Sequence, residues 1–400
     1  MNILILTFWS YDDALIQAYT LPYVQIINEN KSIKKIFFVT LEKEVLSKEK
    51  KEKIATVLAK QGINWFPLRY HRFGARAIVT WLGSGLLLAT LIFKKNISVI
   101  HCWCTPAGAI GYFLSLLTGR KLVIDSYEPH AEAMVESKTW SKKSIAFMLL
   151  FWLEKKQSQR ASNFILATAG MKPYALTKYG VVIKSYFVKP ACVNSALYLN
   201  EFVKEKKLLN ELSLEGKIVC VYAGKFGDLY FEEESFRFFK TAYDFWKGDF
   251  CVLLLTNQDR KTIDHYCAKV GLDSSVVISR FVAHTDVPRY LSLADFAITP
   301  MKPIPSRRYC TPIKNGEYWA AGLPVVIPNG ISDDSEIIEK GNIGAVIDSL
   351  DAKNCSLAVE KINLLLQGDR AELRKKIKSV AVRYRDFSVA KKIYSDLYSA

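Results

Sequence analysis

Residues 311–327 read TPIKNGEYWAAGLPVVI, which predicts a turn, a short helix and a buried strand in succession. Thr311 is a suitable N-cap, and Pro312 suits the first helical position because its φ already matches a helix. Gly322 suits the position just beyond the helix end, where the left-handed conformation is common. The amino end of this helix would present unpaired N–H groups and the positive end of the helix dipole, which favour an anion such as a diphosphate.

Two side chains of this helix carry charge near its amino end. Lys314 lies in the first turn and could place a full positive charge beside a bound anion. Glu317 lies three residues further on, so the two side chains share a face of the helix. A carboxylate one turn behind a phosphate site is well placed to accept hydrogen bonds from ribose hydroxyls. An exposed ion pair between Lys314 and Glu317 is the alternative interpretation.

Around this segment, short apolar runs alternate with longer helical patterns through most of the chain. Runs that are apolar on both faces and alternate with helices indicate parallel strands covered from both sides. The polar, Lys-rich segment 191–210 interrupts the alternation and is a candidate linker. The apolar runs are residues 3–8, 36–40, 64–68, 99–103, 122–125 and 164–167 before it, and 218–223, 251–256, 276–279, 296–300, 324–327 and 345–347 after it.

This alternation predicts an α/β fold with two facing Rossmann-like doubly wound domains, a cleft between them and C-terminal helices across the seam. We place the first domain at residues 1–195 and the second at 196–380. A C-terminal helix at 381–400 is expected to pack back towards the first domain. Ligands bind outside the carboxyl ends of the strands in such sheets, so the cleft is the expected binding site.

The composition supports large buried cores and limits the kinds of partner. Half of the 400 residues are hydrophobic and 12% are aromatic, which excludes a disordered chain and a disulfide-stapled miniprotein. The 55 Lys and Arg exceed the 39 Asp and Glu, so the formal net charge is +16. Such an excess favours a polyanion, an anionic membrane surface or a phosphorylated small molecule. The basic residues are dispersed among acidic ones, which disfavours nucleic acid.

Several common motifs are absent from the chain. The eight cysteines show no C-x-x-C spacing, so we expect reduced, packed thiols, no metal site and a cytosolic protein. Residues 1–8 are interpreted as a first buried strand and not as a signal peptide. There is no P-loop, no G-x-G-x-x-G after the first strand, no H-E-x-x-H and no G-x-S-x-G. These absences count against common ATPases, nicotinamide enzymes, zinc proteases and serine hydrolases.

Two apolar segments bear on membranes. Residues 77–93 carry no charge, but they are slightly short for a membrane span and contain two glycines, so we interpret them as a buried crossover helix. Residues 144–153 are apolar and have two lysines on each side. This second pattern fits either a core helix or a helix that lies in a lipid headgroup layer.

The segment 309–326 resembles the donor-binding segment of retaining GT-B glycosyltransferases, specifically glycosyltransferase family 4. That family typically has a Glu five residues before the Gly of an Ala-Ala-Gly-x-Pro-Val-Val ending, and Glu317 and Gly322 match this spacing. The resemblance implies that Glu317 binds the ribose of a nucleotide-sugar and that Lys314, in a Pro-x-Lys lead-in, approaches the diphosphate. Where many members have a Glu that contacts the donor sugar, this chain has Tyr309. The candidate donor-binding residues of this segment are Tyr309, Thr311, Ile313, Lys314 and Glu317.

A segment after the first strand of the second domain extends the resemblance. The family has a Gly there, followed by a basic residue that contacts the diphosphate, and Gly224 and Lys225 match this pair. A second basic residue usually follows a few positions on, but residues 230–234 are aromatic and acidic in this chain. That contact is therefore missing or is supplied by Arg307, Arg308 or Lys314.

The remaining candidates lie on the base side and in the first domain. Phe281 and Val282 resemble the family's base-side loop, whose backbone would face the nucleobase. Family members often place a His near the transferring sugar, after a strand of the first domain, and His130 is the nearest match. A purely structural His is the alternative. Glu128 could orient His130 or meet the acceptor hydroxyl.

The resemblance implies a metal-independent, retaining hexosyltransferase that needs no cofactor. It would move a sugar from a UDP- or GDP-linked donor to a glycan or lipid-linked glycan. Lys225, Lys314 and the helix amino end near Ile313 would stabilise negative charge on the leaving diphosphate, and the candidate catalytic residues are Lys225, Lys314, Glu128 and His130.

We expect the first domain to bind the acceptor, and the protein to act in surface polysaccharide or glycoconjugate synthesis. The expected location is the cytoplasm, at the inner face of the cell membrane and in peripheral contact with anionic lipid. The alternatives are a non-catalytic GT-B-like binding or scaffold subunit, a sugar-nucleotide epimerase, and a phosphorylase with a lysine-bound pyridoxal cofactor.

Overall fold

The computed structural model describes residues 1–13, 15–71, 75–198 and 204–399, without the side chains of residues 75–79. The chain forms two compact units: unit 1 is Met1–Pro190 with Ser388–Ala400, and unit 2 is Ala191–Phe387. The chain passes from unit 1 to unit 2 after Pro190 and returns to unit 1 after Phe387, a few residues from the boundaries that we expected at 195 and 380. A backbone pairing inside unit 2 explains this, because the Val193 N–H donates to the Arg385 carbonyl and the Phe387 N–H donates to the Val193 carbonyl.

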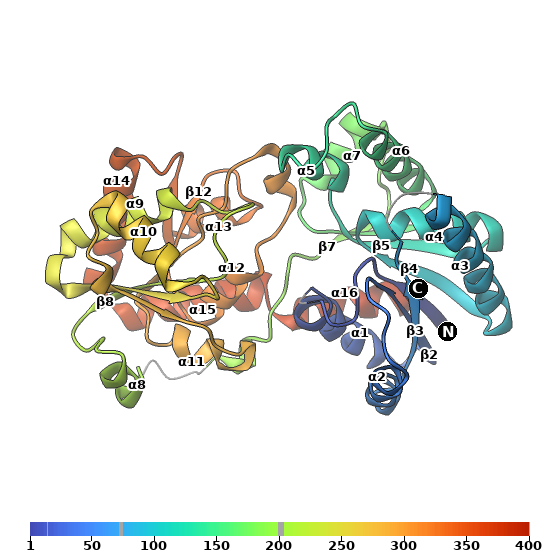
Figure 1. Cartoon of the computed structure of the whole chain (residues 1–400), viewed down its shortest axis with the longest axis horizontal. Coiled ribbons are helices and arrows are strands. Elements are labelled where there is room, and N and C mark those ends of the chain that lie inside the picture. The colour runs from blue at the N-terminus through green and yellow to red at the C-terminus, as the bar shows by residue number, and fades with distance from the viewer. Residues whose placement is uncertain (14, 72–74, 199–203, 400) are drawn as a thin grey trace. The chain divides into compact units, whose positions relative to one another are not determined.

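Unit 1 contains a parallel sheet of seven strands in the order β3-β2-β1-β4-β5-β6-β7 (Figure 1). The central strand β1 pairs with β2 on one side and with β4 on the other. Most residues of the strands in this sheet are buried on both faces, which is why the strands appear in the sequence as continuous apolar runs. The strands are β1 (Asn2–Leu6), β2 (Lys35–Glu42), β3 (Ile63–Arg69), β4 (Ile97–Trp103), β5 (Lys121–Tyr127), β6 (Asn163–Leu166) and β7 (Tyr186–Val188).

Helices cover both faces of the unit 1 sheet. Parallel crossovers are right-handed, so α1 and α2, which lead from β1 towards β3, cover one face. The helices α3, α4 and α6 lead back towards β7 and cover the other face (Figure 1). The helices are η1 (Ile16–Thr20), α1 (Leu21–Asn28), α2 (Lys48–Lys60), α3 (Ala75–Lys94), α4 (Cys104–Thr118), α5 (His130–Glu136), α6 (Ile145–Arg160), α7 (Met171–Tyr179) and α16 (Phe387–Ser399).

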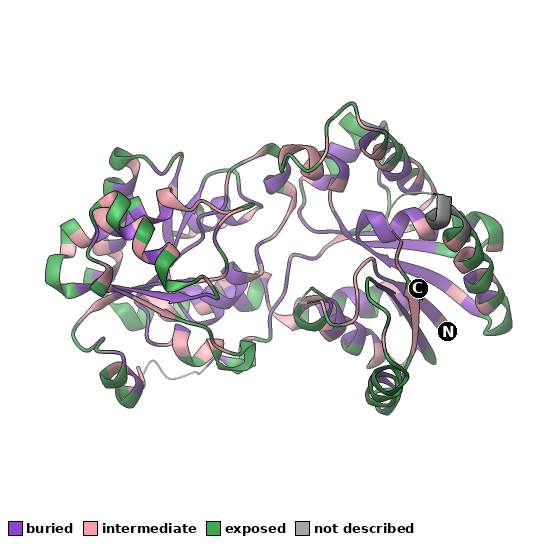
Figure 2. Ribbon diagram, viewed as in Figure 1, coloured by how far each residue is buried: buried purple, intermediate pink, exposed green. Residues whose placement is uncertain are grey.

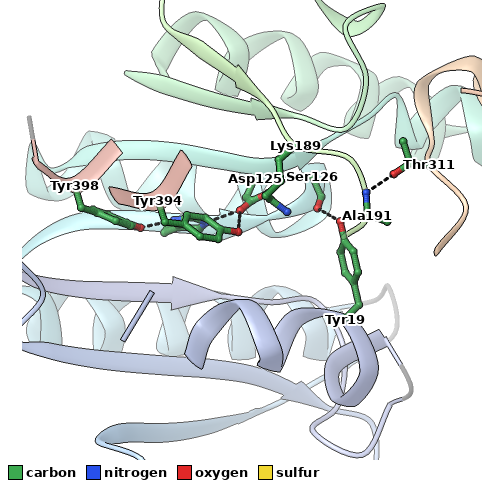
Figure 3. Close-up of polar contacts among 9 residues, drawn as sticks. Tyr19, Asp125, Ser126, Lys189, Ala191, Thr311, Tyr394 and Tyr398 are labelled. Atoms are coloured by element: carbon green, nitrogen blue, oxygen red, sulfur yellow. Dashed lines mark hydrogen bonds and ion pairs between the residues drawn. The ribbon is translucent and has the colours of Figure 1, made fainter. Parts of the chain in front are cut away.

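A buried polar cluster near the carboxyl end of β5 attaches α16 to unit 1 (Figure 3). The Asp125 carboxylate pairs with the Lys189 ammonium, with 3.3 Å between Oδ1 and Nζ. It also accepts a hydrogen bond from the Tyr394 hydroxyl at 2.6 Å and shares one with the His101 ring at 3.2 Å. Burial alone would raise the pKa of Asp125, but Lys189 and these hydrogen bonds hold it below its usual value. The end of β5 is therefore fixed where the chain enters the loop of Glu128.

Unit 2 contains a parallel sheet of six strands in the order β10-β9-β8-β11-β12-β13. Side chains alternate across a strand, so Val219 and Val221 of β8 point into one apolar cluster, and Cys220 and Tyr222 point into the other. Figure 2 shows most of the strands of both units as buried and the outward sides of many helices as exposed. The strands are β8 (Ile218–Ala223), β9 (Phe250–Leu255), β10 (Val277–Arg280), β11 (Phe296–Ile298), β12 (Val325–Pro328) and β13 (Gly344–Ile347).

Helices and short helical turns connect the strands of unit 2. They are η2 (Ser195–Leu197), α8 (Lys206–Glu211), α9 (Glu233–Trp246), η3 (Lys247–Asp249), α10 (Arg260–Val270), η4 (Ser274–Val276), η5 (His284–Asp286), α11 (Val287–Leu291), η6 (Pro305–Tyr309), α12 (Ile313–Ala320), α13 (Asp334–Gly341), α14 (Ala352–Gln367) and α15 (Arg370–Tyr384).

The twelve apolar runs identified in the sequence all form strands, β1–β6 and β8–β13. The prediction that residues 77–93 are a buried helix is wrong in one respect. They form the crossover helix α3, but Leu82, Leu86, Leu87 and Phe93 on it are exposed, because α3 covers the sheet with only one of its sides. Within the described part of the chain, no helix has both the length and the apolar composition needed to cross a bilayer.

Candidate anion-binding site

The helix α12 begins one residue later than the sequence predicted. Pro312 is its N-cap, and the Thr311 hydroxyl does not cap it. Thr311 instead accepts a hydrogen bond from the Ala191 N–H at 2.8 Å (Figure 3), a partner 120 residues away that local pattern cannot reveal. The other end agrees with the prediction, because Gly322 follows the helix with a φ of +73°. Ile313 is the first helical residue and is partly buried against the core.

Lys314 lies in the first turn of α12 and is buried. Its ammonium lies 3.7 Å from the ring centre of Tyr230 and 4.7 Å from that of Tyr222, and it donates to the Tyr222 hydroxyl at 3.4 Å. No carboxylate of the described residues forms an ion pair with it. Burial lowers the pKa of Lys314 to about 7, although Glu317 opposes the shift. Lys314 is therefore a buried amine that titrates near neutral pH and has no ion-pair partner among the described residues.

Gly224 follows β8 and lies against the Lys314 ammonium. Its φ is +145°, and a Cβ at this position would lie 2.9 Å from the Lys314 Nζ. Any side chain at residue 224 would therefore displace the Lys314 ammonium, which explains why this position is a glycine. The structure brings together two of the residues that the sequence analysis selected from segments 90 residues apart.

Lys225 is adjacent in sequence to Gly224, but its side chain is exposed. Its ammonium pairs with the Asp228 carboxylate at 2.7 Å, and this hydrogen bond lowers the pKa of Asp228. The loop that follows β8 is held by a buried side chain, because the Tyr222 hydroxyl donates to the Lys225 carbonyl at 2.6 Å.

Arg307 is a second buried basic residue of unit 2. It lies in η6 with 6% of its surface exposed, and its Nε has no hydrogen-bond partner. Burial raises the pKa of Tyr230 to about 12, and the charge of Arg307 opposes this shift, so Arg307 acts electrostatically on the ring that covers Lys314. Within the described part of the chain, no carboxylate pairs with either cation. The sequence had offered Arg307 only as one of three sources for a missing basic contact.

Glu317 lies one turn further along α12 and is also buried. Its Oε1 contacts the Nε2 of His284 at 3.1 Å, a hydrogen bond that raises the pKa of His284. The exposed ion pair with Lys314, which was the alternative interpretation, does not form. His284 was part of a quoted motif but not a candidate site residue, and only the fold shows that it meets Glu317.

Phe281 and Val282 lie in the loop between β10 and η5, just before His284. The side chain of Phe281 is 80% exposed, whereas Val282 packs partly against the core. This loop therefore holds an exposed aromatic ring on the segment that reaches the Glu317 carboxylate. Tyr309 ends η6 and is partly buried, three residues before the N-cap of α12.

A network of buried hydrogen bonds holds α12 in place. The Asn315 amide donates to the Asp334 carboxylate at 2.6 Å and accepts from the Thr299 hydroxyl. Arg385 donates to the same Asp334 carboxylate. The Tyr318 hydroxyl accepts from the Ala223 N–H at 2.8 Å, which ties α12 to the end of β8. The positions of Gly224 and Lys314 are therefore set by one rigid framework.

The two catalytic candidates of unit 1 lie where β5 ends. Glu128 is half-buried, and its carbonyl accepts a hydrogen bond from the N–H of His130 at 3.0 Å. His130 is the first residue of α5. The first turn of α5 rests on the buried carboxyl of Glu154 in α6, which accepts from the Ala131 N–H at 3.0 Å and from the Tyr179 hydroxyl at 2.8 Å. Burial raises the pKa of Glu154 to about 7.

Within the described residues, no group of three His, Cys, Asp or Glu side chains could hold a metal ion. The positive charge at the site comes from Lys314 and Arg307.

A family model described as the C-terminal domain of glucosyltransferase 3-like proteins matches residues 304–396. This match begins just before η6 and includes Arg307, Lys314 and Glu317. No curated protein sequence matches the chain.

The whole chain resembles solved two-domain structures. HepE from Anabaena, crystallised with UDP, is 13% identical with a TM-score of 0.74, and each chain is covered fully. A sucrose-phosphate synthase from Thermosynechococcus elongatus is also 13% identical, with a TM-score of 0.70 over 100% of this chain and 98% of the other. WaaG, a glycosyltransferase involved in lipopolysaccharide biosynthesis, is 10% identical, with a TM-score of 0.68 over 99% of both chains. These likenesses confirm the predicted fold class of two Rossmann-like domains of the GT-B type.

Proposed function

We propose that this chain is a glycosyltransferase that binds the diphosphate of a nucleotide-sugar around Lys314 and Arg307. The observation that carries the proposal is the burial of two basic side chains without a carboxylate partner among the described residues, Lys314 against the Tyr230 ring and Arg307 in η6. Leaving a buried charge unpaired costs several kcal/mol, so such a pair is expected only where a ligand supplies the opposite charge. A diphosphate supplies two or more negative charges.

The other donor contacts follow from the same framework. The free N–H groups at the start of α12, near Ile313, and the backbone beside Gly224 would donate to phosphate oxygens. Glu317 would accept from the ribose hydroxyls, and His284 holds its carboxylate in place. Phe281 and Val282 would lie along the nucleobase. Lys225 would join the diphosphate by leaving its exposed pair with Asp228, which costs little because exposed ion pairs are weak.

The proposed chemistry is stabilisation of the leaving group. Breaking the anomeric C–O bond places negative charge on the diphosphate, and Lys314 and Arg307 stabilise that charge without reorganisation because the fold already fixes them. The two cations fill the role that a divalent metal has in other transferases, so the proposal requires none. We assign no side-chain nucleophile, in keeping with retention by same-face attack assisted by the leaving phosphate. UDP-glucose is the first donor to test, since the matching family model describes glucosyltransferases and HepE has been crystallised with UDP-glucose.

The acceptor is assigned to unit 1. Glu128 and His130 lie at the carboxyl end of β5, the edge of a doubly wound sheet where ligands bind. We propose that His130 lies near the transferring sugar, that Glu128 orients His130 or meets the acceptor hydroxyl, and that the acceptor is a glycan or a lipid-linked glycan at the cytoplasmic face of a membrane. The likeness to WaaG supports a role in surface polysaccharide or glycoconjugate synthesis.

A thermal-shift panel tests the donor assignment, because a ligand that binds only the folded state raises its Tm. We expect UDP, GDP or one of their sugars to raise the Tm of the wild type, and uridine to have little effect. Glu317→Gln should weaken this response, whereas Lys353→Met, an exposed lysine of α14, is the matched control that should not. A panel in which no nucleoside diphosphate stabilises the protein would refute the proposal. Donor consumption without any acceptor would indicate an epimerase instead.

A further inference from the structure

Exposed apolar side chains concentrate on one side of unit 1. Of the 24 large hydrophobic residues that are exposed in the described part of the chain, 12 lie on only three helices, α3, α4 and α6. Soluble surfaces rarely collect so many in one place unless they bind something. We call this set the apolar face; its members are Trp81, Leu82, Leu86, Leu87, Phe93, Phe113, Leu116, Leu117, Ile145, Met148, Leu149 and Trp152.

Their spacing shows that each helix presents a stripe. On α6, Ile145, Met148, Leu149 and Trp152 follow the i, i+3, i+4, i+7 pattern of a single helix side. On α4, residues 113, 116 and 117 have the spacing i, i+3, i+4 and also share one helix side. On α3, residues 82, 86 and 93 are four and seven residues apart, which again places them on one side.

The three helices lie on the same face of the sheet, opposite α1 and α2 (Figure 1). The Arg160 guanidinium at the end of α6 donates to the Ser115 carbonyl of α4 at 3.2 Å, which holds these two helices together. The stripes therefore form a joint surface.

Apart from the buried Glu154, the charges on the three helices and next to their ends have one sign. Residues 53–124, which include all of α3 and α4, contain no Asp or Glu. The only acidic residue within the three helices is Glu154, which is buried and hydrogen-bonded inside unit 1. The basic residues at the helix ends are Lys94, Lys95, Arg120, Lys121, Lys142, Lys143, Lys155, Lys156 and Arg160.

This combination determines the kind of occupant. A second copy of the chain would bring the same positive rim against itself, and an acidic protein would leave the broad apolar face without a match. An anionic lipid bilayer offers hydrocarbon for the stripes and negative headgroups for the rim, with no demand for a complementary shape. Trp152, with the Lys156 ammonium 5.8 Å from its ring centre, has the amphipathic character of residues at a headgroup layer.

We propose that the apolar face of α3, α4 and α6 docks unit 1 onto the surface of an anionic bilayer. This rests on the proposed function and deepens it, because it names the surface by which the chain would reach an acceptor at a membrane. It also extends the expectation from the sequence, in which only residues 144–153 were a candidate for lipid contact, to two further helices.

The test is co-sedimentation of the full chain with vesicles, without nucleotide or acceptor. We expect binding to phosphatidylcholine vesicles that contain phosphatidylglycerol, and at least about tenfold weaker binding to phosphatidylcholine alone. The double variant Leu86→Glu with Leu117→Glu should reduce binding to the anionic vesicles by at least about tenfold, since it places two carboxylates in the contact. Both positions are more than half exposed, so the fold should tolerate the change.

Leu364→Glu is the matched control. Leu364 lies on α14 of unit 2 and is 67% exposed, against 69% for Leu86, so both changes have the same cost in water. Equal binding by the double variant and the control would overturn the proposal. So would equal binding to neutral and anionic vesicles, or a self-associated wild type in sedimentation velocity that the double variant converts to monomer. None of these results depends on nucleotide binding, so they leave the donor assignment untouched.

Discussion

Replacement of Lys314 by methionine removes a buried ammonium while it keeps a flexible apolar side chain in the same space. In the folded protein the pKa of Lys314 is about 7, against 10.5 in an unfolded chain. The unfolded state therefore binds more protons between these two values, and wild-type stability should rise with pH from about 7 to about 10.5. At pH 7 the linkage corresponds to a cost of about 4 kcal/mol for the apo protein.

The rings of Tyr222 and Tyr230 offset part of this cost. Two cation–π contacts at 4.7 and 3.7 Å contribute on the order of 1–2 kcal/mol, which Lys314→Met loses. The variant should therefore gain about 2–3 kcal/mol at pH 7, or roughly 5–10 °C in Tm for a unit of this size. Its stability should no longer rise between pH 7 and 10.

Binding of UDP should show the opposite dependence on Lys314. A diphosphate favours the ammonium, so UDP binding to the wild type takes up a proton, and its Kd should increase up to about tenfold for each pH unit above 7. Differential scanning fluorimetry gives the Tm values, and calorimetry in two buffers of different ionisation enthalpy gives the proton uptake. A variant that is no more stable than the wild type, together with UDP binding that is independent of pH, would refute the reasoning.

Three further predictions follow from the same geometry. Arg307→Gln should raise the Tm of the apo protein and weaken UDP binding by about tenfold or more, because it removes the second unpaired buried charge; unchanged UDP affinity by calorimetry would contradict this. Glu317→Gln should weaken binding of UDP by about tenfold but leave the affinity for inorganic pyrophosphate, which has no ribose, unchanged in the same assay. Glu154 has its pKa raised from 4.5 to about 7, so the folded state holds the proton more tightly and stability should fall as pH rises from about 4.5 to 7. Glu154→Gln should remove this loss, worth about 3 kcal/mol at pH 8, and urea unfolding at pH 5 and pH 8 measures it.

The strands were predictable because a parallel sheet covered on both faces forces each central strand to be apolar throughout. β7 escaped prediction because it has only three residues, at the edge of the sheet. The helices α5, α7, α8 and α13 also escaped prediction, because six to nine residues give too few turns for a convincing apolar period. The N-cap at Thr311 was wrong for a different reason, since its hydroxyl has a distant partner at Ala191.

The site was predictable only in part. The spacing of Lys314, Glu317 and Gly322 on one helix is local, and the sequence contains it in full. The contact between Glu317 and His284 joins positions 33 residues apart, and the burial of Arg307 depends on packing that no window of sequence describes.

The sequence by itself determined where twelve of the thirteen strands lie, where glycine is needed at the end of α12 and which residues carry charge, because these properties depend on near neighbours along the chain. Only the tertiary structure decided which charged side chains are buried away from solvent. Lys314 and Lys225 are both lysines beside a glycine of the candidate site, yet one is buried between two aromatic rings and the other pairs with Asp228 in solvent. The tertiary structure also decided that the apolar stripes of α3, α4 and α6 are exposed, because an apolar helix lies in the core or at the surface according to what packs against it. Desolvation is a property of the assembled fold, and it sets both the pKa of Lys314 and the character of that surface.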